Sequence, residues 1–66
     1  MEVISEFFGV DEYEHRSSLV RQISANLYHV EIYDEYGLYK IKKMQDCSVE
    51  TAEYCAEDWV LGVIES

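Results

Sequence analysis

Two short segments in the middle of the chain alternate apolar and polar side chains, and this alternation constrains the fold more than any other feature. Residues 27–33 read Leu-Tyr-His-Val-Glu-Ile-Tyr, and residues 38–44 read Leu-Tyr-Lys-Ile-Lys-Lys-Met. A period of two in β-branched and aromatic residues is typical of strands that bury one face. The intervening residues 34–37 end in a glycine, which can adopt the positive φ of a tight turn. The pattern predicts a β-hairpin.

The same alternation predicts the register of this hairpin. With residues 34–37 as the loop, one register places the apolar residues Val30, Ile32, Tyr39 and Ile41 on a single face and opposes a glutamate to a lysine on the other. The expected pairs are Tyr33–Leu38, Ile32–Tyr39, Glu31–Lys40 and Val30–Ile41.

The segment before the hairpin has two interpretations. Residues 18–24 can form a third strand, joined to the hairpin by a two-residue loop at Ala25 and Asn26, because asparagine tolerates the left-handed region that such a loop needs. The register of this strand places the charged Arg21 on the apolar face, which is an argument against the strand. A helix from Asp11 to Ser24 is the competing interpretation. The pairs expected for the strand are Ile23–Tyr28 and Leu19–Ile32.

The C-terminal segment predicts a helix over about residues 49–61. Ser48 is a natural N-cap, Glu50 and Glu53 favour the positive end of the helix dipole, and Gly62 can end the helix in a left-handed conformation. We expect Trp59 at the centre of the core. The apolar side chains recur at helical spacing: Val49, Ala52, Ala56, Trp59, Val60 and Val63.

A chain of 66 residues is one domain at most. We therefore predict a single small two-layer α+β domain, residues 1–66, in which an antiparallel three-stranded meander (about 18–24, 27–33 and 38–44) carries the C-terminal helix on one face. Residues 1–15 have no clear assignment. Their apolar side chains fit either one turn of helix or a short strand edge: Val3, Ile4, Phe7 and Phe8.

Net charge and hydropathy exclude several classes of function. The chain has 14 acidic and 5 basic side chains, a formal net charge of −9, which argues against binding to nucleic acid or to an anionic membrane. No apolar run approaches the roughly 20 residues that span a bilayer, and the N-terminus lacks the pattern of a signal peptide. We expect a cytoplasmic protein with neither nucleic acid nor membrane as a direct partner.

The charge is distributed unevenly. Residues 1–14 carry five acids and residues 45–66 carry six, with no base in either segment, whereas residues 15–44 carry all five bases and only three acids. One interpretation is intramolecular, with the acidic ends folding near the basic centre. The other is an acidic surface that binds a basic protein surface. The candidate partner-binding residues lie on the helix: Glu50, Glu53, Tyr54, Glu57 and Asp58.

Neither a metal site nor a catalytic site is predicted. Cys47 and Cys55 would be about 10 Å or more apart along the helix, too far for a disulfide, and we expect two reduced thiols. With His15 and His29 they lack the spacing of zinc ligands. A chain this short can hardly enclose a catalytic pocket as well as a core. We expect no cofactor, no metal and no enzymatic activity.

The helix segment resembles a family of phage proteins. Residues 52–62, with their acidic-Trp-x-Leu-Gly ending, are similar to those of small uncharacterised proteins encoded by large tailed phages of marine cyanobacteria, and the resemblance extends over residues 28–64. It implies expression in the cytoplasm of a bacterial host and no known enzymatic role. It implies no binding or catalytic residues.

These observations lead to one expected function and two alternatives. We expect a non-enzymatic, phage-type accessory protein that acts by protein–protein interaction through its acidic surface. One alternative is a self-associating structural protein whose interface uses edge strands and the apolar N-terminal residues. The other is an acidic nucleic-acid mimic that blocks a DNA-binding protein.

Overall fold

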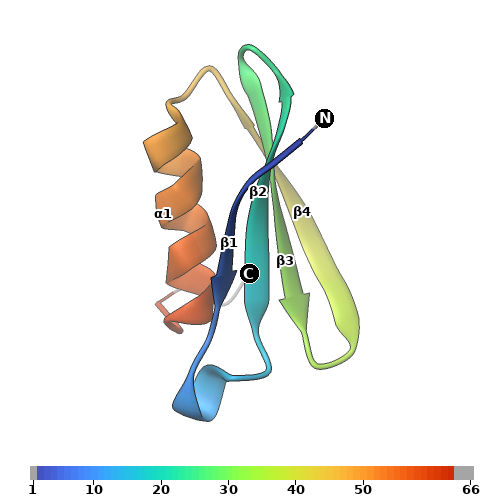
Figure 1. The fold of residues 1–66 in the computed structure, drawn as a ribbon, viewed down its shortest axis with the longest axis vertical. Coiled ribbons are helices and arrows are strands. Elements are labelled where there is room, and N and C mark those ends of the chain that lie inside the picture. Colours follow the sequence, from blue (N-terminus) through green and yellow to red (C-terminus); the bar gives the residue numbers. More distant parts are fainter. Residues whose placement is uncertain (1, 64–66) are drawn as a thin grey trace.

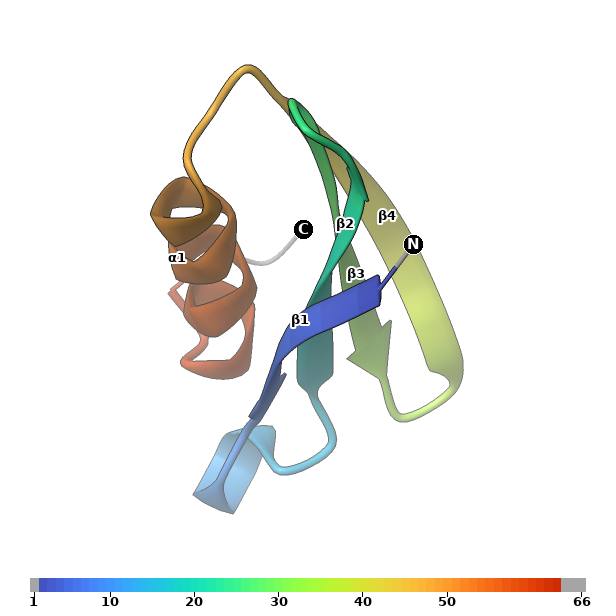
Figure 2. The same cartoon turned by 45° about the horizontal axis from the view of Figure 1, so that its top comes forward.

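The computed structural model describes residues 2–63. It contains a four-stranded antiparallel sheet in the order β1–β2–β3–β4, with one helix packed on one face (Figures 1 and 2). The predicted two-layer α+β class is confirmed. The elements are β1 (Glu2–Phe8), a short 3₁₀ helix (Asp11–Tyr13), β2 (Ser17–Ser24), β3 (Leu27–Asp34), β4 (Gly37–Gln45) and α1 (Val49–Val60).

The sheet has four strands, so the prediction of three strands is wrong. The additional strand, β1, pairs antiparallel with β2 and contains an irregularity between Val3 and Ser5. An extra residue in a strand breaks the alternation of its side chains, which is why this segment shows no strand pattern in sequence. Phe7 packs against the core, whereas Phe8 is 70% exposed. The two phenylalanines therefore point to opposite faces of one strand.

The hairpin of β3 and β4 has the predicted turn but not the predicted register. Tyr33 pairs with Leu38 as expected, and the glycine of the turn adopts a φ of +113°. Beyond this pair the register shifts by one residue at Tyr39, and such a shift exchanges the two faces of a strand. Because of this bulge the other predicted pairs are wrong. The observed pairs are Ile32–Lys40, Glu31–Ile41 and Val30–Lys42.

The hairpin of β2 and β3 shows the same deviation. Its two-residue loop is confirmed, because Ser24 pairs with Leu27, but the register shifts between Gln22 and Ser24. The shift moves Arg21 to the face away from the helix, which removes the conflict in the predicted register. The helix considered for residues 11–24 is wrong, because most of that segment is β2. The predicted pairs are therefore wrong. The observed pairs are Gln22–Tyr28, Val20–Val30 and Ser18–Ile32, in place of Ile23–Tyr28 and Leu19–Ile32.

Helix α1 begins and ends as the sequence predicts. The Ser48 hydroxyl accepts a hydrogen bond from the Thr51 amide, 3.3 Å away. At the other end Gly62 has a φ of +77°, and the amides of Gly62 and Val63 donate to the carbonyls of Trp59 and Asp58. This is a Schellman motif. The predicted apolar stripe includes Val63, but this side chain is 66% exposed, because the chain leaves the helix at this turn.

The core lies between α1 and the central strands. Trp59 is 3% exposed, and its indole N–H donates to the carbonyl of Tyr33, 3.0 Å away. The buried Ser18 hydroxyl donates to the carbonyl of Ala56, 2.7 Å away, and so joins β2 to α1. The predicted central position of Trp59 is confirmed. The buried apolar residues are Val20, Tyr28, Val30 and Ile32 from the sheet and Ala52, Ala56, Trp59 and Val60 from the helix.

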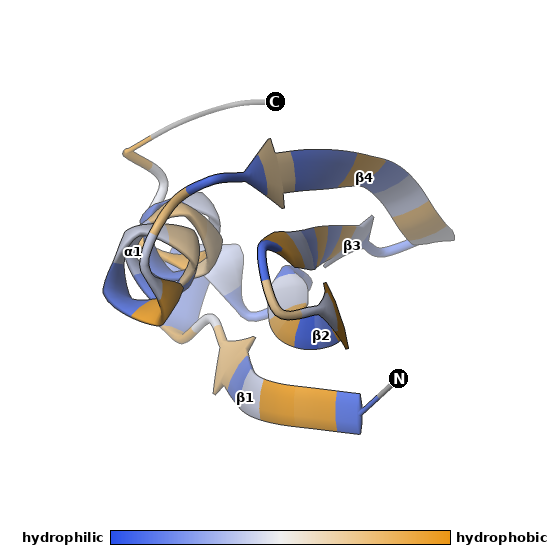
Figure 3. Cartoon of the chain, turned by 90° about the horizontal axis from the view of Figure 1, so that it is seen from above, coloured by the Kyte–Doolittle hydropathy of each residue, from blue (hydrophilic) through white to orange (hydrophobic). Residues whose placement is uncertain are grey.

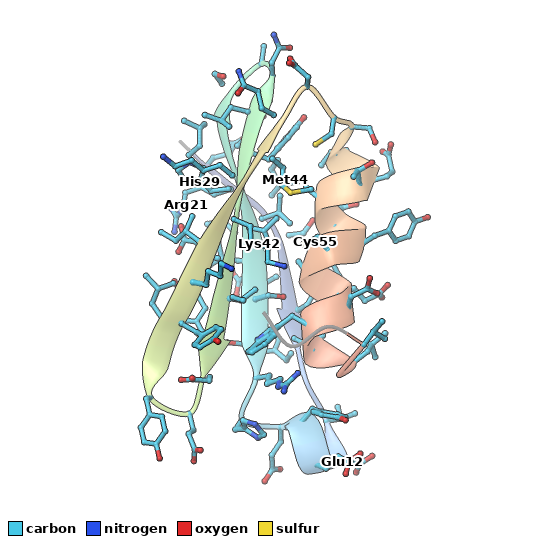
Figure 4. All side chains as sticks on the ribbon, turned by 180° about the vertical axis from the view of Figure 1, so that it is seen from behind. Glu12, Arg21, His29, Lys42, Met44 and Cys55 are labelled. Carbon is cyan, nitrogen blue, oxygen red and sulfur yellow. The ribbon has the colours of Figure 1, made fainter. Side chains whose placement is uncertain are left out.

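The other sheet face is not covered by the helix, and we call it the open face. Arg21 and His29 lie on this side, whereas Lys42, Met44 and Cys55 lie on the side of α1 (Figure 4). The pairing registers define three rows of neighbours across the open face. The rows are Phe8–Ser17–Tyr33–Leu38, Glu6–Leu19–Glu31–Ile41 and Val3–Arg21–His29–Lys43.

Candidate functional site

Four of the five predicted partner-binding residues line one groove between α1 and β1. Residues three, four and seven positions apart share a face of an α-helix, and Glu50, Glu53, Tyr54 and Glu57 have this spacing. The groove has a volume of about 190 Å³, and Phe7 of β1 completes its lining. We call these five residues the acidic groove.

Asp58, the fifth predicted residue, does not line the groove. It follows Glu57 directly, and one residue turns an α-helix by roughly 100°. Asp58 therefore lies beyond Tyr54, which precedes it by one helical turn and forms that side of the groove. The structure separates Asp58 from the other four residues, although all five lie close together in sequence.

Strand β1 supplies two groups that sequence reasoning missed. Phe7 contributes an aromatic ring to the lining, and the Ser5 hydroxyl donates a hydrogen bond to the carboxylate of Glu53. This bond fixes Glu53 over the edge of the sheet. Ser5 pairs with Val20 and Phe7 with Ser18, so both point toward α1. No pattern in the sequence indicates this, because the β1 irregularity hides which residues face the helix.

The groove gathers negative charge beside aromatic surface. Three carboxylates line it, and none of them forms an ion pair with another residue in the range 2–63. Tyr54, which is 66% exposed, and Phe7 supply apolar surface. Carboxylates make strong charge-assisted hydrogen bonds with guanidinium and ammonium groups, and aromatic rings attract the same cations. The groove is therefore suited to basic side chains.

The arginines of the protein lie away from the groove. Arg16 lies over the Trp59 ring, with its guanidinium carbon 4.1 Å from the ring centre, and donates to the Trp59 carbonyl. Arg21 pairs with Glu31 at 2.8 Å. Both partners of this ion pair come from the central segment of the chain. The pair therefore gives no neutralisation of the acidic helix.

A second polar cluster lies on the open face around Glu31. One oxygen of this carboxylate accepts from the Tyr33 hydroxyl at 2.6 Å, and the other accepts from Arg21. The Tyr33 hydrogen bond, with a smaller contribution from Arg21, lowers the pKa of Glu31 although burial opposes the shift. The same hydrogen bond raises the pKa of Tyr33. Both carboxylate oxygens thus have partners within the protein, so we interpret the cluster as a structural network.

Cys47 and Cys55 are free thiols, both partly buried against the core. Over the described part of the chain, no group of three or more histidine, cysteine, aspartate or glutamate side chains is placed to hold a metal ion. Among the helical residues that the structure covers, none forms a segment long and apolar enough to cross a membrane.

Comparison with protein-family models, with curated proteins and with solved structures finds no match to this chain.

Proposed function

We propose that this protein is a non-enzymatic interaction protein that binds a basic segment of a partner in the acidic groove. The observation that carries the proposal is the convergence of three carboxylates and two aromatic rings from two elements on one concavity. Aromatic residues are enriched in protein–protein interfaces, and complementary charges across an interface steer the partners together. An arginine or lysine entering the groove would neutralise carboxylates that have no cation of their own within residues 2–63.

The shape of the groove favours one or two basic side chains over a duplex nucleic acid or an extended basic surface. Its volume of about 190 Å³ matches side chains rather than a whole element. We propose in addition that the protein is a phage-type accessory protein of the host cytoplasm. The proposal of a phage origin rests on the resemblance of residues 28–64 to cyanobacterial phage proteins.

The test is binding of a fluorescently labelled peptide that carries two arginines in an extended sequence. The double variant Glu53→Gln/Glu57→Gln removes two groove carboxylates with little change in shape, and the new amide oxygen at position 53 can still accept from Ser5. We expect affinity to fall about tenfold or more, since hydrogen bonds to charged groups contribute about 1.5–3 kcal/mol each. Fluorescence anisotropy measures the affinity.

Asp58→Asn is the matched control, because it removes a carboxylate from the same helix outside the groove. We expect it to change the affinity less than about twofold, because this partly exposed charge does not line the groove. Equal losses in the control and in the groove variant would mean that the peptide responds only to net charge, and the proposal would be wrong.

A further inference from the structure

Within residues 2–63 the sheet has two free edges. In the order β1–β2–β3–β4, the described part of β1 pairs only with β2 and that of β4 only with β3. Seen from above, these two strands form the opposite borders of the sheet (Figure 3). A free edge offers unpaired backbone N–H and C=O groups to another strand. Each edge can therefore accept a further strand from outside the molecule.

The two edges carry opposite charge. Strand β4 holds three lysines, and none of them forms an ion pair with any residue between 2 and 63. Strand β1 holds two glutamates and borders the acidic groove. The arginines do not contribute to this contrast, because Arg16 and Arg21 are held on Trp59 and Glu31. The lysines are Lys40, Lys42 and Lys43, and the glutamates are Glu2 and Glu6.

The charges also match face by face. Lys40 and Lys42 pair with the buried Ile32 and Val30, so both lie on the α1 side, which is the side of the acidic groove. Lys43 pairs with His29 on the open face. On β1, Glu6 pairs with Leu19 and lies on the open face as well. On the α1 side, therefore, lysines of the β4 edge match the acidic groove beside the β1 edge. On the open face, Lys43 of β4 matches Glu6 of β1.

Strand direction permits the two edges to join without inverting a molecule. In a four-stranded antiparallel meander the first and last strands run in opposite directions. A second copy in the same orientation would thus place its β1 antiparallel to β4 of the first, about 4.8 Å away. The strands are similar in length, with 7 residues in β1 and 9 in β4. The combined sheet would keep every helix on one side.

The helix leaves β4 available for this contact. It packs mainly on β2 and β3, with a smaller contact to β1, and most of β4 is exposed, including Tyr39 at 51%. In the joined sheet, α1 of the second copy would lie next to this strand. The acidic groove of that copy would then border Lys40 and Lys42.

We propose that the occupants of the acidic groove are the Lys40 and Lys42 side chains of a second copy of this chain, whose β4 adds to the β1 edge and places these lysines against Glu53 and Glu57. The inference rests on the proposed function, since the site is the same, and it names the partner. The contact is head-to-tail, so a joined pair keeps one free β1 edge on one copy and one free β4 edge on the other. Such contacts build open chains unless the rotation closes a ring.

Analytical ultracentrifugation of the full chain tests this proposal. We expect the wild type to exceed the monomer mass as concentration rises. The variants Lys40→Glu/Lys42→Glu and Glu53→Lys/Glu57→Lys should each remain monomeric, because each creates like charges at the contact. An equimolar mixture of the two variants restores opposite charges where unlike copies meet, and we expect it to assemble above the monomer mass.

Two outcomes would overturn the proposal: a wild type that stays monomeric at all concentrations, or assembly that survives the lysine substitutions, which would indicate the open face instead. Asp58→Lys is the control for the added charge and should assemble normally. Circular dichroism checks that each variant is folded. A monomeric wild type that still binds the diarginine peptide through Glu53 and Glu57 would contradict self-assembly alone and leave the proposed function standing.

Discussion

At the scale of single residues, Glu31 shows how a charged side chain is accommodated on a sheet. It is 9% exposed, and both of its oxygens are hydrogen-bonded, one to Tyr33 and one to Arg21. The sequence predicts Lys40 as its partner, directly across the hairpin. The bulge at Tyr39 moves that lysine to the other face, and Arg21 takes its place from the strand on the opposite side. A buried carboxylate left without partners would be strongly destabilising.

The lowered pKa of Glu31 predicts a pH-dependent stability. A carboxyl group with a lower pKa in the folded state stabilises the protein above its unfolded pKa of about 4.3, and this contribution is lost as pH falls through the folded pKa. We expect Glu31→Gln to lower the free energy of unfolding by about 1–3 kcal/mol at pH 7. The deficit relative to wild type should shrink as pH falls below the pKa of the unfolded carboxyl. Urea unfolding at a series of pH values measures it.

Glu35→Gln provides the comparison, because Glu35 is exposed in the β3–β4 turn. The free energy of unfolding of this variant should depend on pH in the same way as that of the wild type. Tyr33→Phe should flatten the profile in part, since it removes the hydrogen bond that does most to lower the pKa of Glu31. A deficit in Glu31→Gln that is constant over the acidic range would contradict the assignment.

At the scale of elements, the ends of the helix and the turns follow from local sequence, whereas strand registers do not. Ser48 and Gly62 act through atoms within a few residues of themselves, so their roles can be recognised from the sequence. The register of each strand pair depends on a bulge, and all three pairs in this sheet have one. A bulge forms where the packing of distant residues favours it, and no local pattern marks its position.

The N-cap gives a prediction for the helix. Replacing Ser48 by alanine removes the hydroxyl that accepts from the Thr51 amide, and we expect a loss of about 1 kcal/mol in the free energy of unfolding. Ser48→Asp should keep most of the stability, because a carboxylate can accept the same bond and interacts favourably with the helix dipole. Chemical denaturation followed by circular dichroism measures both. An alanine variant as stable as the wild type would rule out a stabilising cap.

At the scale of the whole molecule, Trp59 joins segments that are far apart in sequence. Its ring stacks on Tyr39 with a centroid separation of 5.5 Å, its indole N–H bonds to β3, and Arg16 lies against it. The helix, the last two strands and the loop before β2 therefore meet at one side chain. Loss of this ring removes contacts from all of them together.

Trp59→Ala should cost about 3–5 kcal/mol. At about 0.05–0.15 kcal/mol per residue, the whole stability of a chain this short is of similar size, so we expect the variant to be largely unfolded. Trp59→Phe keeps an aromatic ring without the N–H donor and should unfold cooperatively at a lower midpoint. Thermal denaturation followed by far-UV circular dichroism separates the two. An alanine variant with a cooperative transition near the wild-type midpoint would contradict the central role of Trp59.

The sequence by itself determined the elements with strong local signals. These are the central hairpin and the helix with its caps, because alternation, turn residues and capping residues act over a few positions. The strand over residues 18–24 was one of two interpretations, and the structure decided between them. Its charge pattern also identified the acidic helix face as a candidate site. Four of those five residues line the groove, because helical spacing alone places them on one side.

Only the tertiary structure decided how these parts meet. It showed β1 as a fourth strand, and thereby brought Ser5 and Phe7 to the acidic helix face. It also placed the lysines of β4 at the opposite edge of the sheet from β1, so that the basic strand lies apart from the acidic groove. The physical reason is that side-chain direction in a strand reverses with each residue. One bulge, stabilised by contacts from elsewhere in the chain, therefore decides which residues share a face.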